Sequence, residues 1–434
     1  MPQNKFKVYS KCISYLFNLE RAGIKYDLTN ITSLLNFLNN PHKKYPAIHI
    51  AGTNGKGSVS SIINSVLTEK GLRSGLYTSP HITDFRERIT VNGQQVSRSF
   101  ILNSVNKLYS EIQNTGPSFF EVTTAIAFDY FRYKKVDVAV IETGLGGRLD
   151  STNIISPVVS VVTGISIDHT DMLGKTLEKI TAEKGGIIKK NTPVVVGHVP
   201  LKSEKILKNI SRERKSDIIF IRNEKRYSIT DRTETGFYFK ENNDPVKYFF
   251  PVIGDYQLEN ISVSKKALEI FEKSESLSFS KPAFIRGLEK VKTNSGLMGR
   301  FEKISDSPKI ITDISHNYQG IKNIKDNLKY FNYDKLYIIF NMMKDKHYAD
   351  CIYEIGKLTG EIVLTQTGYN RAASPEDLYI TVKKNKKKFI IKKTVSESLR
   401  YVIEKSEKND LILITGSFFL VSEALEQLNK FKNI

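Results

Sequence analysis

The stretch AIHIAGTNGKGS, residues 47–58, decides the fold class of this chain. Its first five residues form an apolar run typical of a buried strand, and an amphipathic stretch from Val59 to about Glu69 follows the glycines. Glycines 52, 55 and 57 allow a tight turn that aims backbone N–H groups at one point, at the positive end of the helix. With Lys56 added, the pattern predicts a phosphate-binding loop (P-loop) and a nucleoside triphosphate as ligand.

The fit to the usual G-x-x-x-x-G-K-[ST] pattern is imperfect. Ile50 stands where the first glycine is expected, and Gly57 separates Lys56 from Ser58. A glycine-rich turn without a ligand is the alternative, but a lysine in the middle of such a turn has little structural use. We therefore predict that a glycine-richer variant of the loop binds ATP through Gly52, Thr53, Asn54, Gly55, Lys56, Gly57 and Ser58.

Composition limits the class of protein. A chain of 434 residues exceeds what one hydrophobic core usually serves, so we expect two domains. Hydrophobic residues make up 40%, mean hydropathy is −0.30, and no apolar stretch has the length needed to cross a bilayer. The first residues resemble neither a secretory signal nor a transit peptide. The two cysteines, Cys12 and Cys351, lie far apart, which fits a reducing compartment, and we expect a cytoplasmic protein.

The formal charge of +19 raises the question of nucleic-acid binding. The lysines are spread along the chain and are not interleaved with aromatic residues; the densest run is 383–388. A basic surface that attracts small polyanionic substrates explains this distribution better. We expect neither nucleic acid nor membrane as a partner.

The order of apolar runs predicts an α/β fold with a mostly parallel sheet. Short β-branched runs alternate with helical patterns at 47–51, 73–77, 136–142, 158–163 and 193–197. Residues 218–250 change to short alternating segments, which predict a small antiparallel patch, and a helix is expected from 258 to about 273.

A second α/β domain is predicted after residues 292–297, which have the composition of an interdomain linker. Its strands are expected at 310–313, 336–340, 361–365 and 411–415. We predict a mononucleotide-binding domain over residues 1–297 and a smaller Rossmann-like domain over 298–434. No G-x-G-x-x-G follows the first strand of the second domain, so dinucleotide binding is not expected.

Polar residues follow several predicted strands, where ligands bind in open parallel sheets. Ser79 follows the second strand, Glu142 closes the third, and His169 follows the fourth. An ionised carboxylate at the end of an apolar run is costly unless it is paired or binds a metal, and Mg²⁺ suits such a site. A salt bridge from Glu142 to Arg148 or to a lysine is the alternative, and His169 on its own fits a buried histidine as well as a ligand.

These segments resemble the folylpolyglutamate synthase and dihydrofolate synthase family, which belongs to the Mur ligase superfamily. The resemblance covers nearly the whole chain and includes IHIAGTNGKGS (48–58), TSPH (78–81), ETGLGGRLDSTN (142–153), DHT (168–170), EKGGI (183–187), GRFE (299–302), DISHN (313–317), KDK (344–346) and TGS (415–417). It implies ATP-dependent amide-bond formation, in which a substrate carboxylate becomes an acyl phosphate and the amine of L-glutamate then displaces phosphate.

The resemblance also implies roles for individual residues. Ser79, Glu142 and His169 match magnesium ligands, and Lys184 matches a lysine that is carbamylated to support a second Mg²⁺. The ATP contacts beyond the loop would be Asn260, Arg300 and Asp313, with His316 close to the nucleotide. Lys56, Lys184, His169 and His316 are thus the candidate catalytic residues. The pterin contacts would be Tyr26, Asp27, Leu28, Phe120, Glu121, Val122, Thr123, Leu149, Asp150 and Ser151.

Three positions depart from the family pattern. Tyr256 replaces a histidine, Tyr318 stands where proline is usual, and residues 293–297 lack an aromatic-proline pair. We expect these changes to affect nucleotide affinity and not the reaction class.

The resemblance leaves the substrate open between dihydropteroate, a reduced folate and both. We predict a bifunctional, monomeric enzyme. Two alternatives remain: a Mur-type ligase that adds an amino acid to a cell-wall nucleotide precursor, and a nucleotide-binding module without turnover. The second is disfavoured because Lys56, Glu142 and His169 are all present.

Overall fold

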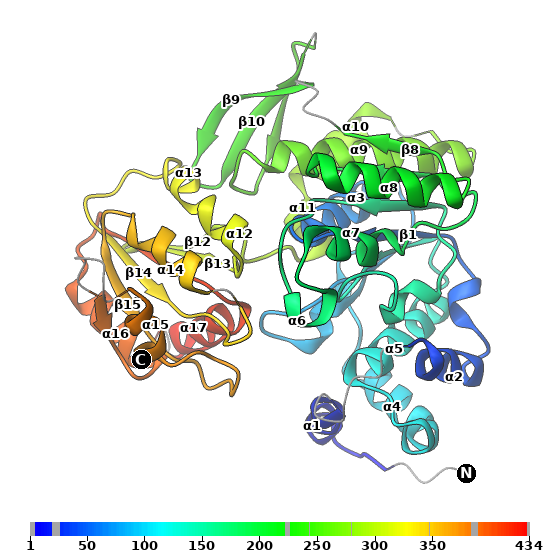
Figure 1. Cartoon of the computed structure of the whole chain (residues 1–434), viewed down its shortest axis with the longest axis horizontal. Coiled ribbons are helices and arrows are strands. Elements are labelled where there is room, and N and C mark those ends of the chain that lie inside the picture. The colour runs from blue at the N-terminus through cyan, green and yellow to red at the C-terminus, as the bar shows by residue number, and fades with distance from the viewer. Residues whose placement is uncertain are drawn as a thin grey trace. The chain divides into compact units, whose positions relative to one another are not determined.

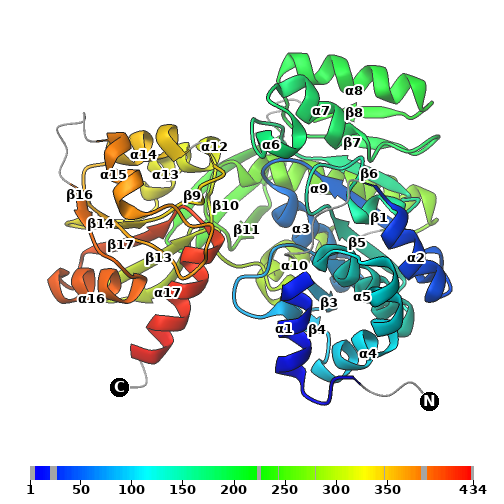
Figure 2. The same ribbon diagram turned by 60° about the horizontal axis from the view of Figure 1, so that its bottom comes forward.

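An eight-stranded sheet forms the centre of the first of two units in the computed structural model (Figures 1 and 2). The structure describes residues 5–19, 27–221, 226–242, 244–278, 280–346, 348–382 and 389–431. The first unit comprises residues 1–224 and 259–296, and the second comprises 225–258 and 297–434. The predicted boundary near residue 297 lies at one of these divisions, whereas residues 225–258, which the sequence assigns to the first domain, group with the second unit.

The first sheet is parallel except at one edge. Its strand order is β4-β3-β2-β5-β1-β6-β7-β8, and only β3 and β4 run antiparallel to their neighbours. The strands are β1 (Ala47–Ala51), β2 (Ser74–Tyr77), β3 (Ile89–Val91), β4 (Gln94–Gln95), β5 (Val138–Glu142), β6 (Val159–Val162), β7 (Val194–Val196) and β8 (Ile218–Phe220). The sequence predicts an antiparallel patch that starts at residue 218. This start is wrong, because β8 pairs in parallel with β7.

Helices cover both faces of this sheet, as expected for parallel strands rich in Val and Ile. They are α1 (Tyr9–Leu19), α2 (Thr29–Phe37), α3 (Lys56–Glu69), α4 (Arg98–Thr115), α5 (Phe119–Tyr133), α6 (Thr170–Leu173), α7 (Leu177–Gly185), α8 (Leu201–Glu213), α9 (Gln257–Ser274), α10 (Lys281–Glu289) and α11 (Val291–Ser295), with the short 3₁₀ turns Pro41–Lys43, Phe85–Arg88 and Ser151–Ile154. The segment predicted as a linker is therefore helical up to Ser295.

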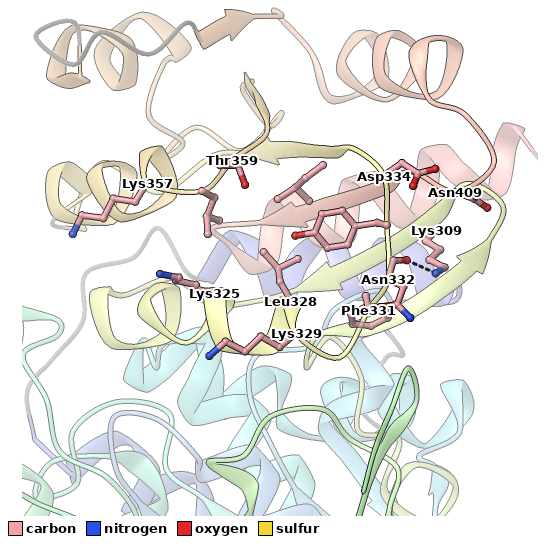
Figure 3. Close-up of a pocket in the computed structure, with 13 residues that line it drawn as sticks. Lys309, Lys325, Leu328, Lys329, Phe331, Asn332, Asp334, Lys357, Thr359 and Asn409 are labelled. Atoms are coloured by element: carbon pink, nitrogen blue, oxygen red, sulfur yellow. Dashed lines mark hydrogen bonds between the residues drawn. The ribbon is translucent and has the colours of Figure 1, made fainter.

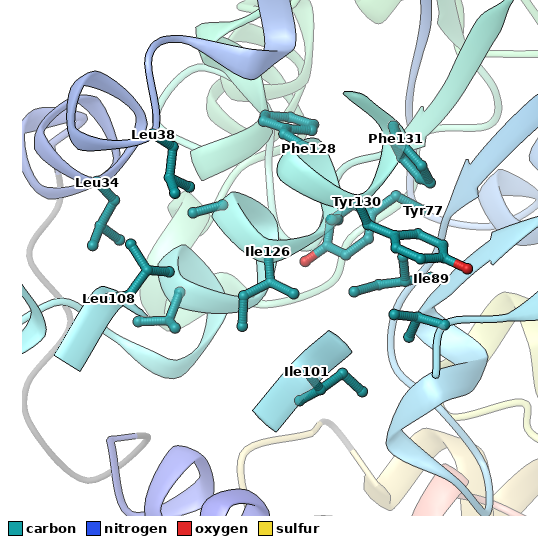
Figure 4. Close-up of a cluster of buried hydrophobic side chains, with 14 of the residues drawn as sticks. Leu34, Leu38, Tyr77, Ile89, Ile101, Leu108, Ile126, Phe128, Tyr130 and Phe131 are labelled. Carbon is teal, nitrogen blue, oxygen red and sulfur yellow. The ribbon is translucent and has the colours of Figure 1, made fainter. Parts of the chain in front are cut away.

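Strand β1 shows how the alternation of side chains assigns the two faces. Ile48 and Ile50 join a cluster with apolar residues of α3 and α9, which we call the α3 cluster. Ala47 and Ala51 face the other side. Ala47 belongs to a cluster around α5 (Figure 4), the α5 cluster, and Ala51 to a cluster around α7 and α8, the α7 cluster.

The second unit holds two sheets. Strands β9 (Tyr227–Thr233), β10 (Gly236–Glu241) and β11 (Lys247–Phe250) form a three-stranded antiparallel sheet. The other sheet has the order β12-β13-β17-β14-β15-β16 and is parallel except for β12. Its strands are β12 (Glu302–Asp306), β13 (Lys309–Asp313), β14 (Leu336–Phe340), β15 (Glu361–Leu364), β16 (Phe389–Ile391) and β17 (Leu411–Thr415).

Within the described residues, the helices that accompany the second parallel sheet are α12 (Tyr318–Lys322), α13 (Ile324–Leu328), α14 (Tyr348–Gly356), α15 (Pro375–Val382), α16 (Val395–Lys405) and α17 (Phe418–Phe431). Both units are thus α/β, which confirms the predicted class at that level. Among the described residues, no helix combines the length and the apolar character that crossing a membrane requires.

Close packing of α10 on α3 leads to a first prediction. A Cβ placed on Gly287 of α10 would lie 2.6 Å from the Cα of Val66 on α3, a backbone atom that cannot move aside. We expect Gly287→Ala to lower the free energy of unfolding by about 1–3 kcal/mol, as overpacked cores do. Urea unfolding measures this change. Gly356→Ala is the control, because the nearest atom to its Cβ is 3.8 Å away; equal losses in both variants would contradict the packing argument.

Candidate functional site

The loops that carry the predicted site residues of the first unit leave neighbouring strands at one edge of the sheet. Strands β2, β5, β1 and β6 are adjacent and parallel, so their carboxyl ends lie side by side. Ser79 follows β2, Glu142 ends β5, the glycine loop follows β1, and His169 lies in the loop after β6. In the β1–β5 register, Ile50 pairs with Glu142.

The glycine loop is built against the loop that follows β6. Gly52 and Gly55 have φ angles of 155° and 87°, and a Cβ on Gly52 would lie 1.9 Å from Oγ1 of Thr163. The N–H of Thr53 donates to the Gly164 carbonyl at 2.7 Å, and Oγ1 of Thr163 donates to the Asn54 carbonyl at 2.7 Å. Thr163 and Gly164 belong to no motif in the sequence, and their place at the end of the predicted strand 158–163 is the signal that points to them.

Two lysines converge on the same carbonyl of this loop. Nζ of Lys56, at the start of α3, lies 3.2 Å from the Gly52 oxygen, and Nζ of Lys184, near the end of α7, lies 2.8 Å from it. Lys184 is only 4% exposed. Two cations at the amino end of a helix create a strongly positive site, which favours an anion such as phosphate.

Asn260 also borders the loop. A Cβ on Gly55 would lie 2.6 Å from Oδ1 of Asn260, so only glycine fits at position 55 beside this side chain. The neighbouring Glu259 accepts the N–H of His198, after β7, at 2.5 Å, and burial raises the pKa of Glu259. Helix α9 therefore brings two polar residues to the same edge of the sheet.

Glu142 and Ser79 are close together, as their strand positions predict. The N–H of Ser79 donates to Oε2 of Glu142 at 3.2 Å, and Glu142 is 4% exposed. The salt bridge of Arg148 is with Glu183, at 2.8 Å, so the alternative of an Arg148–Glu142 pair is not realised. A buried carboxylate next to a serine residue is chemically suited to a hard divalent cation.

His169 lies just before α6 in the left-handed conformation, with φ 49°. Its N–H donates to Oδ1 of the buried Asp168 at 2.8 Å, and its side chain is 32% exposed. The ring is thus held near a carboxylate while part of it stays accessible, which leaves room for the predicted ligand role.

The segment after β5 is fixed by Asp150. Oδ2 of this carboxylate accepts the Leu145 N–H at 2.8 Å, and Oδ1 accepts the N–H and the hydroxyl of Thr152 at 3.0 and 2.5 Å. Burial raises the pKa of Asp150 in spite of these hydrogen bonds. The Asp150 carboxylate, which the resemblance assigns to pterin binding, therefore already forms hydrogen bonds that hold its own loop together.

The same segment packs on the end of α7. A Cβ on Gly147 would lie 2.7 Å from the Glu183 carbonyl, and one on Gly186 would lie 2.4 Å from Cβ of Arg148. The N–H of Arg148 donates to the Glu183 carbonyl at 2.7 Å. The glycines of GLGGRLD and EKGG thus let the two segments touch, which fixes the helix that carries Lys184.

The other predicted pterin residues lie in different surroundings. Tyr26 is outside the described residues. Asp27 accepts the N–H of Thr29 at 2.8 Å, ahead of α2, and Leu28 packs against the α5 cluster. Phe120 lies against Gly144, where a Cβ would come within 2.4 Å of its ring.

Helix α5 uses several of its predicted pterin residues for its own structure. Glu121 completes a capping box with Ser118, accepting its N–H at 2.7 Å, and Thr123 donates to the Phe119 carbonyl at 2.7 Å. Val122 is fully buried in the α5 cluster. Of the remaining two, Leu149 is half-buried and Ser151 is 8% exposed, in the turn capped by Asp150.

In the second unit, Asp313 ends β13 and is buried. Its carboxylate accepts the N–H groups of Phe301 and Ser315, both at 3.1 Å. Burial raises the pKa of Asp313, while the positive charge of Arg300 opposes that rise. Nη1 of Arg300 is buried and makes no hydrogen bond within the described part of the chain, so this guanidinium has a donor to offer to a ligand.

His316 and the two tyrosines that depart from the family pattern belong to the same unit. Nδ1 of His316 is 3.0 Å from the Ile314 carbonyl, and its ring lies 5.5 Å from that of Phe418. Burial raises the pKa of Tyr256, and the negative charge of the Asp313 carboxylate adds to the rise. Tyr318 is exposed and its hydroxyl donates to Glu354 at 3.2 Å.

A pocket on the second unit lies away from these residues (Figure 3). It is found where β13 and β14 begin, at the opposite sheet edge from Asp313. Four of its lining residues are lysines, but Lys309, Lys329 and Lys357 pair with Glu234, Asp326 and Glu354, at 2.7, 2.6 and 2.6 Å. The local charges largely cancel, so we assign no function to this pocket.

Comparison with known families places both units in one class of enzymes. Residues 50–268 match the Mur ligase middle domain, and residues 299–418 match the glutamate ligase domain of Mur ligases. The chain is thus a Mur ligase by class.

The family follows from relatives that match over their full length. The chain is 31% identical to the dihydrofolate synthase/folylpolyglutamate synthase of Bacillus subtilis, covering 98% of this chain and 100% of the relative. It is also 31% identical to the folylpolyglutamate synthase of Lacticaseibacillus casei, covering 97% and 98%. The structure of E. coli FolC in complex with DHPP and ADP is similar, with a TM-score of 0.86, 27% identity and full coverage of both chains. The chain belongs to the folylpolyglutamate synthase/dihydrofolate synthase family, as its motifs predict.

Two buried histidines generate a prediction on pH. Burial lowers the pKa of His42 to about 4 and that of His49 to about 3, from the ordinary value of 6.5. At pH values between 6.5 and these lowered pKa values, the two histidines bind protons in the unfolded chain but not in the folded chain. The free energy of unfolding should therefore fall as pH drops below 6.5. Urea unfolding from about pH 7 to about pH 4.5 measures the slope. His42→Gln should flatten it, and an unchanged slope in this variant would contradict the assignment.

Proposed function

We propose that the protein is an ATP-dependent ligase that joins L-glutamate to a carboxylate of dihydropteroate and of reduced folates, acting as both dihydrofolate synthase and folylpolyglutamate synthase. The observation that carries the proposal is the convergence of Lys56 and Lys184 on the Gly52 carbonyl of a glycine loop. The relatives support the choice of substrate, because the Bacillus subtilis protein is named for both activities and the E. coli structure contains DHPP and ADP.

Two steps account for this reaction. An oxygen of the substrate carboxylate attacks the γ-phosphorus of ATP, so that an acyl phosphate forms and ADP leaves. The amine of L-glutamate then attacks the acyl carbon, and an amide forms as inorganic phosphate leaves. The loop from Gly52 to Ser58 would hold the phosphates as a P-loop, with Lys56 balancing the charge that develops on the transferred group.

The second unit would supply further nucleotide contacts as a Rossmann-like domain. The Arg300 donor, which lacks a partner among the described residues, suits a phosphate, and Asp313 would accept hydrogen bonds from ribose hydroxyls. Asn260, at the glycine loop, and His316 complete the proposed nucleotide contacts. We also propose that the protein acts as a cytoplasmic monomer.

Glu142, Ser79 and His169 would hold Mg²⁺, which when bound neutralises phosphate charge. The buried carboxylate of Glu142 beside Ser79 supports this donor set. We propose in addition that Lys184 is carbamylated and supports a second Mg²⁺. A carbamate would turn one of the two cations at the Gly52 carbonyl into an anion and so remove their mutual repulsion.

The pterin would bind on the segment around Gly144, where the ring of Phe120 offers a flat apolar surface. Tyr26, Asp27, Leu28, Glu121, Val122, Thr123, Leu149, Asp150 and Ser151 are the other proposed contacts. Because the Asp150 carboxylate already accepts three hydrogen bonds, its share in pterin recognition would be smaller than that of the backbone it fixes.

The proposal is tested by glutamate-dependent ADP release with Mg²⁺ and ATP. We expect release with dihydropteroate and with tetrahydrofolate in parallel assays, and no release when glutamate is omitted. Release with one pterin alone would assign the enzyme to that half-reaction. Release with a cell-wall nucleotide precursor and with neither pterin would establish the alternative Mur-type ligase.

Lys56 should be essential for turnover. Lys56→Ala removes the charge that faces the transferred phosphate, and we expect kcat to fall by at least about a hundredfold with the fold intact. Lys44→Ala removes the same charge from an exposed position before β1 and is the control. Near-normal turnover of Lys56→Ala would contradict the P-loop assignment.

The carbamate proposal is tested at Lys184. Lys184→Ala should lower kcat strongly, and short carboxylic acids such as acetate should restore part of it by replacing the missing carboxylate. Lys179→Ala on the same helix is the control, because its side chain is exposed. Full activity of Lys184→Ala without added acid would eliminate the carbamate.

A further inference from the structure

A strip of three buried polar residues, His49, Thr152 and Asp150, joins strand β1 to the segment that follows β5. His49, in the middle of β1, is fully buried and pairs in register with Ile141 of β5 and Ser160 of β6. It shares its face with Ala47 and Ala51, which belong to the α5 and α7 clusters. A polar ring therefore occupies a position with apolar clusters on either side.

His49 is connected to Asp150 through one hydroxyl group. Its Nε2 lies 2.9 Å from Oγ1 of Thr152, and that hydroxyl donates to Oδ1 of Asp150 at 2.5 Å. A threonine hydroxyl has a single hydrogen, which here goes to the carboxylate, so the imidazole must be the donor to Oγ1. The chain of hydrogen bonds therefore runs in one direction, from His49 through Thr152 to Asp150.

This arrangement stabilises the fold less than an apolar residue would. With Nε2 as the donor, Nδ1 is a buried acceptor, and it has no hydrogen-bond partner in the described chain. Burying such an acceptor costs free energy, whereas leucine at this position would cost none of it. Burial lowers the pKa of His49 to about 3, so the ring is neutral and contributes no ion pair.

We infer that His49 is a positioning residue for substrate binding: through Thr152 it orients Asp150, and Asp150 fixes residues 143–152 against which the pterin ring binds. The identity of the ligand rests on the proposed function. Asp150 carries the effect onward because its other oxygen accepts the Leu145 N–H, one residue after Gly144, which contacts Phe120. The imidazole is fully buried, so it acts through Thr152 and Asp150.

Amide hydrogen exchange tests the positioning directly and without a ligand. His49→Leu should speed the exchange of the Leu145 and Thr152 amides, which both donate to Asp150, and leave the strand amides of β6 unchanged. His49→Gln offers an amide N–H as donor and should restore most of the protection. Unchanged exchange in His49→Leu would overturn the inference.

Steady-state kinetics then show whether the loss of this hydrogen bond weakens binding of the pterin substrate. His49→Leu should raise KM for the pterin substrate about fivefold, the value of one hydrogen bond, with KM for ATP and kcat within about twofold of wild type. His49→Gln should bring KM back toward the wild-type value. An equal rise in both KM values, or no rescue by glutamine, would mean that His49 only supports the fold.

His42→Leu is the matched control. His42 is also a buried histidine whose Nδ1 has no hydrogen-bond partner among the described residues, but it packs on Phe128 in the C-terminal half of α5. We expect His42→Leu to change stability without changing exchange at Leu145 or KM for the pterin. The same changes as in His49→Leu would overturn the inference.

If His49→Leu does not fold, Thr152→Val removes the connecting hydroxyl at nearly constant volume. This variant should show the same faster exchange at Leu145 and the same rise in KM for the pterin.

The outcomes separate this inference from the proposed function. If wild-type protein releases no ADP with any pterin, the proposed function fails, while the exchange at Leu145 still decides the role of His49. If neither His49→Leu nor Thr152→Val folds, the strip is a requirement of the core and the inference is wrong.

Discussion

The contact between the glycine loop and Thr163 is the constraint on which the first unit depends. Gly52 turns with a φ angle of 155°, and only the lack of a Cβ lets Thr163 approach it so closely. This approach joins the loops after β1 and β6 and turns the Gly52 carbonyl toward Lys56 and Lys184. A side chain at position 52 would therefore disturb the loop, its neighbour and both cations at once.

Much of the fold could be predicted because short parallel strands buried on both faces leave a clear apolar pattern. The runs at 47–51, 336–340 and 411–415 coincide with β1, β14 and β17. The short strands at one edge of the sheet could not be found in this way. Strand β3 has three residues, and β4, which pairs only with β3, consists of the exposed Gln94 and Gln95. Residues 292–297 have the composition of a linker, but α11 (Val291–Ser295) occupies most of this segment, because its polar residues bind α3: Asn294 forms hydrogen bonds with Asn64, Ser65 and Glu69.

The candidate site shows a similar division between what sequence reveals and what geometry adds. The glycines and Lys56 are contiguous, so a motif was enough to find them. Lys184 was found through a family resemblance, whereas its contact with the Gly52 carbonyl depends on α7 being held by the segment after β5. The resemblance assigns Asp150 and Glu121 to the pterin, yet each carboxylate accepts hydrogen bonds from its own segment. Local hydrogen bonding of this kind leaves no periodic pattern in the sequence.

Helix α3 is covered by residues 287–294, and this affects the order in which the polypeptide folds. Val66 of α3 packs against Gly287, and the Asn64 side chain donates to the carbonyl of Asn294, 230 residues later in the chain. Between them the chain leaves the first unit, builds β9 to β11 within the second, and returns at residue 259. During synthesis on a ribosome, the helix that follows the glycine loop thus keeps an uncovered apolar side until nearly 300 residues have emerged. Long-range closure of this kind is slow, so the nascent chain has a long interval in which chaperones can engage it.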